Sequence, residues 1–145
     1  MSNLYKLIVK LTSRFFTPQA LKFIFVGISG IFVNQFSLYF LHETNFFLSL
    51  PVASILAIEL SILNNFTWNN IWTFKGRKKG LIRKLSRFHI SSSIGAAVNF
   101  IILLSLSSIG FNIYFSNLIG IFLSFLIRFS LSEFWVWNDD VSNNS

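Results

Sequence analysis

Residues 23–41 read FIFVGISGIFVNQFSLYFL, a stretch of 19 residues without a charged side chain. The hydrocarbon core of a bilayer is roughly 30 Å thick, and a helix rises about 1.5 Å per residue, so about 20 residues cross it. Three further stretches have similar length and apolar character, at residues 48–66, 90–109 and 113–131. None shows the strict apolar and polar alternation of a barrel strand. The sequence therefore predicts an all-α integral membrane protein with four transmembrane helices.

The composition of the whole chain agrees with this prediction. Of its 145 residues, 53% are hydrophobic, 12% are charged and 19 are phenylalanine, and the mean hydropathy is +0.63. A soluble domain carries about 25% charged residues, and a disordered chain is richer in charge and poorer in aromatic residues. Both classes are excluded. The chain has no cysteine, and His42 and His89 stand alone, so no disulfide and no metal site is predicted.

The basic residues lie on one side of the predicted topology. Residues 1–22 contain four Lys and Arg residues, and the loop at about 75–87 contains seven, whereas the loop around His42 and the turn at 110–112 contain none. Loops rich in Lys and Arg stay in the cytoplasm, so we expect a multi-pass protein of the cytoplasmic (inner) membrane with both termini cytoplasmic. The isoelectric point near 10.2 then reflects attraction to anionic membrane lipids rather than to nucleic acid.

The chain contains an internal repeat. The motif F-x6-G-x2-V-N occupies residues 23–34 and recurs at residues 88–99, an offset of 65. The aromatic residues Phe66, Trp72 and Phe74 near the end of the second span have aromatic counterparts 63 residues later. Because two spans separate the copies, the sequence predicts two parallel two-helix repeats, each preceded by a basic amphipathic segment. Such a repeat either builds a bundle by duplication or encloses a ligand path, and both interpretations stay open.

Two runs of sequence resemble membrane helices of the GtrA-like family. The first reads AIELSILNNFTWNNIWTF over residues 57–74 and is similar to the second helix of the family. The second run reads NLIG at residues 117–120 and ends in WVW at residues 135–137, like the fourth helix. Together with the Gly and Asn pattern at Gly30 and Asn34, the resemblance covers about residues 23–137.

The resemblance implies a small four-helix membrane protein of cell-surface polysaccharide or glycoconjugate synthesis, acting on polyprenyl-phosphate-linked sugars. Members are proposed to flip such glycolipids to the outer leaflet, and other members are viewed as anchors that recruit a glycosyltransferase. The expected organisation is a basic amphipathic segment at residues 1–22, a GtrA-like membrane domain at residues 23–137 and a polar tail at residues 138–145. Arg128 stands where an Asn is usual in the family.

Several polar residues fall inside the predicted spans. Glu59 lies near mid-membrane, where a charged carboxylate costs at least about 2.5 to 3.5 kcal/mol. It is either a hydrogen-bonding or proton-titrating group in a ligand cavity or a structural clamp to Arg128 or a neighbouring helix. Asn34 and Asn99 fall at matching depths on repeat-related helices, which suits an interhelical hydrogen bond or a sugar contact. Arg128 near the inner end is either a phosphate ligand or an interfacial anchor.

We therefore predict two sets of ligand-binding residues. The substrate set consists of Glu59, Asn34, Asn99, Asn65, Asn69 and Arg128. The set for phosphate or lipid headgroups consists of Lys22, Arg83, Lys84 and Arg87. The Asn cluster at the end of the second span equally suits a helix cap, and the four Trp residues suit an interfacial aromatic belt. Four helices enclose little volume, so we expect a homo-oligomer.

No pattern typical of an enzyme is present in the sequence. There is no Gly-rich phosphate loop, pair of catalytic carboxylates, catalytic triad or metal-ligand spacing. We expect that the chain is not an enzyme and uses no cofactor. The favoured function is translocation of a polyprenyl-phosphate-linked sugar across the membrane. The alternatives are a membrane anchor that recruits a glycosyltransferase and a small proton-coupled exporter that uses Glu59.

Overall fold

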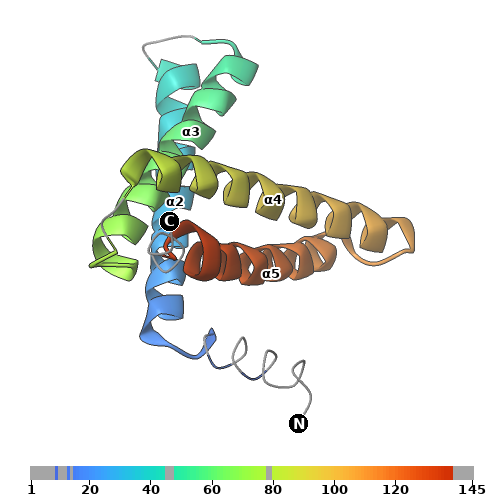
Figure 1. The fold of residues 1–145 in the computed structure, drawn as a ribbon. Helices are drawn as coiled ribbons and strands as arrows, with labels where there is room; N and C mark the ends of the chain where they lie inside the picture. The colour runs from blue at the N-terminus through green and yellow to red at the C-terminus, as the bar shows by residue number, and fades with distance from the viewer. Residues whose placement is uncertain (1–8, 10–12, 14, 45–47, 78–79, 139–145) are drawn as a thin grey trace. The chain divides into compact units, whose positions relative to one another are not determined.

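The computed structural model describes residues 9, 13, 15–44, 48–77 and 80–138, which form helices and no strands (Figure 1). The helical elements, in which η marks a π-helical turn, are α2 (Pro18–Tyr39), η1 (Phe40–Thr44), α3 (Leu50–Trp68), η2 (Asn69–Thr73), α4 (Leu81–Ser108), α5 (Ile113–Leu131) and η3 (Ser132–Val136). The prediction of an all-α protein is confirmed.

Four helical stretches are long and apolar enough to cross a membrane, as predicted. They are Pro18–Glu43, Leu50–Thr73, Leu81–Ser108 and Phe115–Val136. The first and third begin earlier than the apolar runs at residues 23 and 90, and the second and fourth continue well beyond residues 66 and 131. An apolar run ends at the first polar cluster, whereas a helix ends where its backbone hydrogen bonds end. The polar ends of these helices were therefore not part of the predicted spans.

Large apolar side chains cover the outward faces of the helices. Phe32 and Phe36 of α2 are 72% and 70% exposed, and Ile55 of α3 is 68% exposed. A continuous apolar surface of this kind would be unfavourable in water and is expected where the surface contacts acyl chains.

The chain forms two compact units, and each is a helical hairpin. The first unit contains residues 16–78 and pairs α2 with α3 (Figure 1). The described part of the second unit contains residues 9, 13, 15 and 80–138, and it pairs α4 with α5. Each unit holds one copy of the repeat that the sequence predicts.

The first unit is held by a helix cap, small residues and an aromatic pair. Thr17 caps α2, with its Oγ1 accepting a hydrogen bond from the Ala20 N–H at 3.4 Å. Ala53 and Ala57 of α3 have no exposed surface, so their small side chains allow close packing. Near the start of α2 and the end of η2, the rings of Phe23 and Phe74 meet edge to face, with centroids 6.3 Å apart.

The second unit uses the same kinds of contact. A turn at Gly110, whose φ of +91° favours glycine, joins α4 to α5. The rings of Phe88 and Trp137 pack edge to face with centroids 5.5 Å apart, and both side chains are completely buried. Phe88 and Trp137 are the repeat counterparts of Phe23 and Phe74, so the same ring contact closes both hairpins.

The repeat extends to an unusual backbone feature. The π-helical turns η2 and η3 begin and end at positions that are 63 residues apart, the offset found in the sequence. Each turn is closed by the N–H of the following aromatic residue. Phe74 donates to the Asn69 carbonyl at 2.8 Å, and Trp137 donates to the Ser132 carbonyl at 3.0 Å. The predicted two-helix repeat is therefore also present in local structure.

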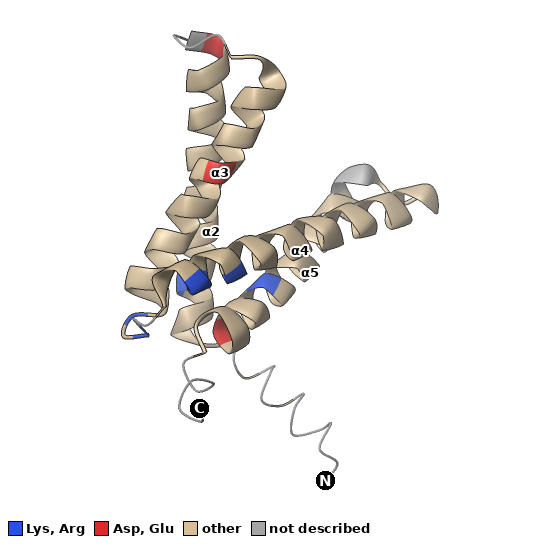
Figure 2. Cartoon of the chain, turned by 45° about the horizontal axis from the view of Figure 1, so that its top comes forward, with Lys and Arg blue, Asp and Glu red and all other residues tan. Residues whose placement is uncertain are grey.

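The predicted basic segment before the third span belongs to that span itself. Helix α4 runs unbroken from Leu81, and the Lys and Arg residues that it contributes lie in its first turns (Figure 2). Helix propensity of Lys, Arg and Leu allows the basic stretch to continue directly into the apolar stretch. The predicted amphipathic segment at residues 1–22 and the tail at 138–145 lie mostly outside the described residues.

Candidate functional site

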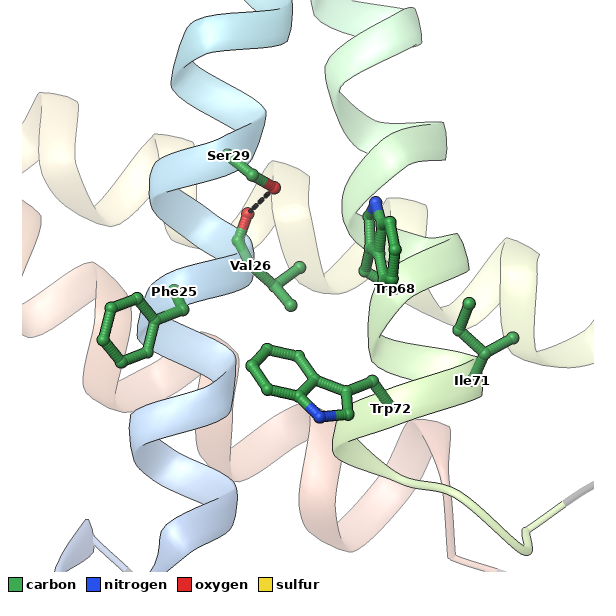
Figure 3. Close-up of a pocket in the computed structure, with 6 residues that line it drawn as sticks. All are labelled: Phe25, Val26, Ser29, Trp68, Ile71 and Trp72. Atoms are coloured by element: carbon green, nitrogen blue, oxygen red, sulfur yellow. Dashed lines mark hydrogen bonds between the residues drawn. The ribbon is translucent and has the colours of Figure 1, made fainter.

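An open groove of about 530 Å³ lies on the first unit, between α2 and the end of α3 (Figure 3). Phe25, Val26 and Ser29 of α2 line one side of it. Trp68 of α3 lines the other side together with Ile71 and Trp72 of η2. The Ser29 hydroxyl donates to the Val26 carbonyl at 2.8 Å, so the groove presents an almost entirely apolar and aromatic lining. Such a surface fits a hydrocarbon chain.

A cation lies at the edge of this groove. The Lys22 Nζ stands 5.5 Å from the centroid of the Trp72 ring, a cation–π arrangement. Lys22 lies three residues before Phe25 on α2, and both residues can therefore contact one ligand. Lys22, one of the predicted headgroup residues, thus contacts the groove-lining Trp72.

A row of buried oxygen atoms runs along a neighbouring face of the same helix. Asn65, Asn69 and Thr73 follow one another at four-residue spacing, and their side chains are 6%, 1% and 4% exposed. Asn65 Oδ1, Asn69 Oδ1 and Thr73 Oγ1 have no hydrogen-bond partner among the described residues. Buried polar atoms are normally satisfied, so this row calls for donor groups from water or a ligand. We refer to these three residues as the polar row.

The polar row begins at a tight contact between the two helices. A Cβ atom at Gly30 would lie 2.7 Å from Asn65 Cγ, so only glycine leaves room for the amide. The Ser61 hydroxyl donates to the Gly30 carbonyl at 2.8 Å and fixes the same crossing point. One position earlier, Asn64 Nδ2 donates to Ser29 Oγ at 3.0 Å and links the crossing to the groove.

The second unit has the same slot with a different occupant. Gly95 is the repeat counterpart of Gly30, and Arg128 is the counterpart of Asn65. A Cβ at Gly95 would lie 2.5 Å from Arg128 Cγ, so the arginine stem lies on α4 where the asparagine lies on α2. Arg128 Nη2 donates to Ser92 Oγ at 3.5 Å, a long hydrogen bond.

The two predicted midplane amides have different surroundings. Asn99 of α4 lies against Gly120 of α5, and its buried Oδ1 has no hydrogen-bond partner among the described residues. Asn34 of α2 is half-buried. Neither residue lines the groove, so a sugar contact by these amides stays a prediction.

Glu59 is half-buried on α3, two residues before Ser61. It lies in the first unit, whereas Arg128 lies in the second, and it is not one of the six groove-lining residues. Its predicted role as a ligand-cavity carboxylate stays a prediction.

The other predicted headgroup residues lie in the first turns of α4. Arg87 Nη1 donates to the Trp135 carbonyl at 2.9 Å, and its Cζ stands 5.4 Å from the centroid of the Trp135 ring. This arrangement repeats that of Lys22 over Trp72, since both pairs are repeat counterparts. Arg83 is exposed and Lys84 is 4% exposed, so these neighbours differ sharply in access to lipid headgroups.

The sequence did not predict the groove. Trp68 and Trp72 were interpreted as part of an aromatic belt, and Phe25, Ser29 and Ile71 received no role. The available signal was the coincidence of two Trp residues with Ile71 on one helical face, opposite a helix with Gly27 and Gly30. That signal predicts that large side chains of one helix face small residues of the other, but it does not give the volume of a groove between them.

Comparison with known proteins gives two relatives and one family. The family model described as GtrA/DPMS, transmembrane domain, matches residues 22–137. A dolichol-phosphate mannosyltransferase of Pyrococcus furiosus is 44% identical over 117 residues, which are 80% of this chain and 33% of that protein. The uncharacterized membrane protein YngA of Bacillus subtilis is 25% identical over 122 residues, which are 84% of this chain and 81% of that protein. With the four spans, the match to a transmembrane-domain family identifies a multi-pass membrane protein.

The prediction that the chain is not an enzyme is contradicted by these comparisons. The Pyrococcus relative is named as a mannosyltransferase, which is an enzyme, and we withdraw the prediction. This chain spans about a third of the length of that relative, so the shared part is the GtrA-like part. The absence of catalytic motifs in the sequence could not reveal this similarity to an enzyme, because the similarity lies in a membrane domain.

Proposed function

Because the chain belongs to the GtrA/DPMS transmembrane-domain family, we propose that it acts in polyprenyl-phosphate sugar metabolism and moves a polyprenyl-phosphate-linked sugar across the membrane. One observation carries this proposal. The first unit combines an apolar aromatic groove with a neighbouring row of buried polar atoms that lack donors. A lipid-linked sugar has the complementary chemistry, since it joins a long hydrocarbon chain to a polyol.

The groove suits the isoprenoid chain. Its lining residues Phe25, Trp68 and Ile71 are about half exposed, at 63%, 48% and 52%, so a chain can enter sideways from the surrounding lipid. Burial of apolar surface against this lining stabilises the bound chain. Lys22 at the groove edge suits an anionic phosphate at the end of the chain.

The polar row suits the sugar. An unpaired polar group costs several kcal/mol when it leaves water for hydrocarbon, so a headgroup cannot cross unaided. Asn65 Oδ1, Asn69 Oδ1 and Thr73 Oγ1 accept hydrogen bonds, and sugar hydroxyls donate them. Replacement of water by these side chains lowers the barrier for the sugar. Direction across the membrane then follows from consumption of the sugar on the far side.

A reconstitution tests this function. Purified protein in vesicles should accelerate leaflet exchange of a labelled polyprenyl-phosphate sugar, and Asn69→Ala should lower the exchange rate about tenfold because it removes one acceptor of the row. Thr67→Ala is the matched control, since Thr67 is exposed and its hydroxyl donates only to its own helix, at Leu63 O. Exchange no faster than in protein-free vesicles would overturn the proposal.

A second candidate function rests on the length of the Pyrococcus relative. That mannosyltransferase is about three times as long as the part matched here, so a separate glycosyltransferase held at the membrane by this chain would complete the same combination. Co-purification of a glycosyltransferase with the tagged chain, together with an absence of leaflet exchange, would favour this second function.

Glu59→Gln belongs in the same assays, because loss of proton-coupled exchange in this variant would identify Glu59 as a functional residue.

A further inference from the structure

Arg128 lies within the fourth candidate span, Phe115–Val136. It is eight residues before Val136, where that span ends, which corresponds to about 12 Å along the helix. The apolar run in the sequence ends at residue 131 and places Arg128 much nearer the inner end. Arg128 is further from the end of the helix than from the end of the apolar run, because η3 extends the helix by a further turn.

The side chain of Arg128 points into the hairpin rather than into lipid. Its aliphatic stem lies against Gly95, where an added Cβ would also be 2.8 Å from Ser124 Oγ. The Nε atom is completely buried and has no hydrogen-bond partner among the described residues. The guanidinium reaches Ser92 Oγ at 3.5 Å. The arginine side chain thus packs among small residues, Ser92, Gly95 and Ser124.

The described part of the chain does not neutralise this charge. No carboxylate among those residues lies within 4.0 Å of the Arg128 guanidinium, and the long contact with Ser92 is its one described hydrogen bond. A guanidinium carries five N–H donors, and an arginine inside a membrane normally pairs with an anion or marks a functional site. The geometry calls for an anionic acceptor.

A phosphate ester matches the required acceptor. The flat guanidinium fork binds phosphate oxygens in pairs, and the Ser92 hydroxyl adds a further donor. The exposed face of this hairpin is apolar, with Ile94, Phe100 and Phe122 at 39%, 60% and 60% exposure, so a lipid reaches the site more readily than a soluble anion. We propose that Arg128 and Ser92 form a phosphate subsite for a membrane lipid, below the level of the surface cations.

This inference rests on the proposed function for the identity of the lipid, polyprenyl phosphate. Lys22 and Arg87 each lie over a Trp ring, in the turns where α2 and α4 begin, and they suit a phosphate at the membrane surface. Arg128 lies further along its hairpin and suits a phosphate that has left the surface. The repeat counterpart of Arg128 is the neutral Asn65, so the deep cation is confined to the second unit.

Lipid binding to the purified full-length chain tests the subsite. The probes are polyprenyl phosphate and polyprenol, which share the hydrocarbon chain and differ in the phosphate, and the readout is the fluorescence of the four Trp residues. We expect Arg128→Gln to weaken polyprenyl phosphate binding at least tenfold and to leave polyprenol binding unchanged. Equal weakening for both lipids, or an equal affinity of the unmodified protein for both, would overturn the subsite.

Arg83→Gln is the matched control for charge, since it removes one positive charge from an exposed position. At about 1 M salt the screening length falls to about 3 Å, so its effect on phosphate binding should disappear. The effect of Arg128→Gln should persist, because a buried pair is screened much less. An Arg128→Gln effect that disappears with salt would place the phosphate at the surface and contradict the inference.

Two further measurements keep the result decisive. If Arg128→Gln does not fold, Arg128→Lys is the second variant, because it keeps the charge without the guanidinium fork. It should retain a reduced preference for the phosphate lipid over polyprenol. A preference in Arg128→Lys equal to that of the unmodified protein would count against the subsite. Equal Arg128-dependent binding of phosphatidylglycerol and polyprenyl phosphate would support the subsite while assigning it to bulk phospholipid. Arg128-dependent binding without leaflet exchange would support the subsite and overturn the proposed translocation, so the two failures are distinguishable.

Discussion

The two hairpins of this protein share their scaffold and differ in the chemistry of one matched slot. In the first unit the slot over Gly30 holds the amide of Asn65, and in the second unit the slot over Gly95 holds the aliphatic stem of Arg128. The edge-to-face ring pair and the π-helical turn recur in both units. Contacts that hold a hairpin together are therefore repeated, whereas the slot is where the side chains of the two units differ in chemistry.

The largest effect is expected from a test of whether the two repeats are parallel. We infer that both termini are cytoplasmic, which places Ser49 and Ser108 on the outer side and Lys75 on the inner side. The native chain has no cysteine, so it serves as the control that should not be labelled. Cysteines at exposed Ser49 and Ser108 should react with an impermeant thiol reagent in intact cells, and a cysteine at exposed Lys75 only after lysis. Labelling of the cysteines at positions 49 and 108 from opposite sides of the membrane would show that the two repeats are antiparallel.

The next effect compares the two glycine contacts. Gly30→Ala and Gly95→Ala should each lower the free energy of unfolding in detergent by about 1 to 3 kcal/mol, because the added Cβ displaces the facing side chain. Gly27→Ala is the control on α2, since a Cβ there meets nothing within 4 Å. A loss in Gly27→Ala equal to that in Gly30→Ala would show that helix backbone effects, rather than the slot, determine the cost.

A smaller effect compares the two cations over Trp rings. Arg87→Ala removes both a ring contact and a 2.9 Å hydrogen bond to the Trp135 carbonyl, and should cost about 1 to 2 kcal/mol in thermal or denaturant unfolding. Lys22→Ala removes the ring contact to Trp72 and should cost less than about 1 kcal/mol. The reverse order would mean that the ring contact outweighs the hydrogen bond.

The smallest effect concerns the serines at the helix crossings. Ser61→Ala removes a hydrogen bond to the Gly30 carbonyl and should destabilise the first unit by about 0.5 to 1.5 kcal/mol. Ser124 is its repeat counterpart and has no hydrogen bond with any described residue, so Ser124→Ala should cost less. Equal unfolding midpoints for Ser61→Ala and the unmodified protein would remove Ser61 from the crossing contact.

The fold was largely predictable because span length and repeat spacing are properties of the sequence itself. Nineteen uncharged residues at 23–41 predict a membrane helix whatever their neighbours are. The continuation of α3 through Asn69 to Thr73 was not predicted, because an apolar window cannot distinguish a polar helix end from a loop. A π-helical turn adds one residue to the turn and leaves no signal in a periodicity of 3.6.

The candidate site was predictable in part. Asn65 and Asn69 were chosen as amides near a helix end, and both belong to the polar row. The groove was missed because its volume depends on the distance between α2 and α3 and on the rotamers of Trp68 and Trp72. The surroundings of Arg128 were not predicted, because its contacts with Gly95 and Ser92 depend on how α4 packs against α5.

The shared π-helical turn also bears on the ancestry of the chain. Such turns make up well under 1% of residues in proteins, so two independent insertions at aligned positions would be an extraordinary coincidence. We infer that η2 and η3 descend from one turn in a hairpin that was later duplicated. On this inference, an ancestor of half the present length already carried the turn. Doubling and fusion then allowed one half to acquire an arginine without imposing it on the other.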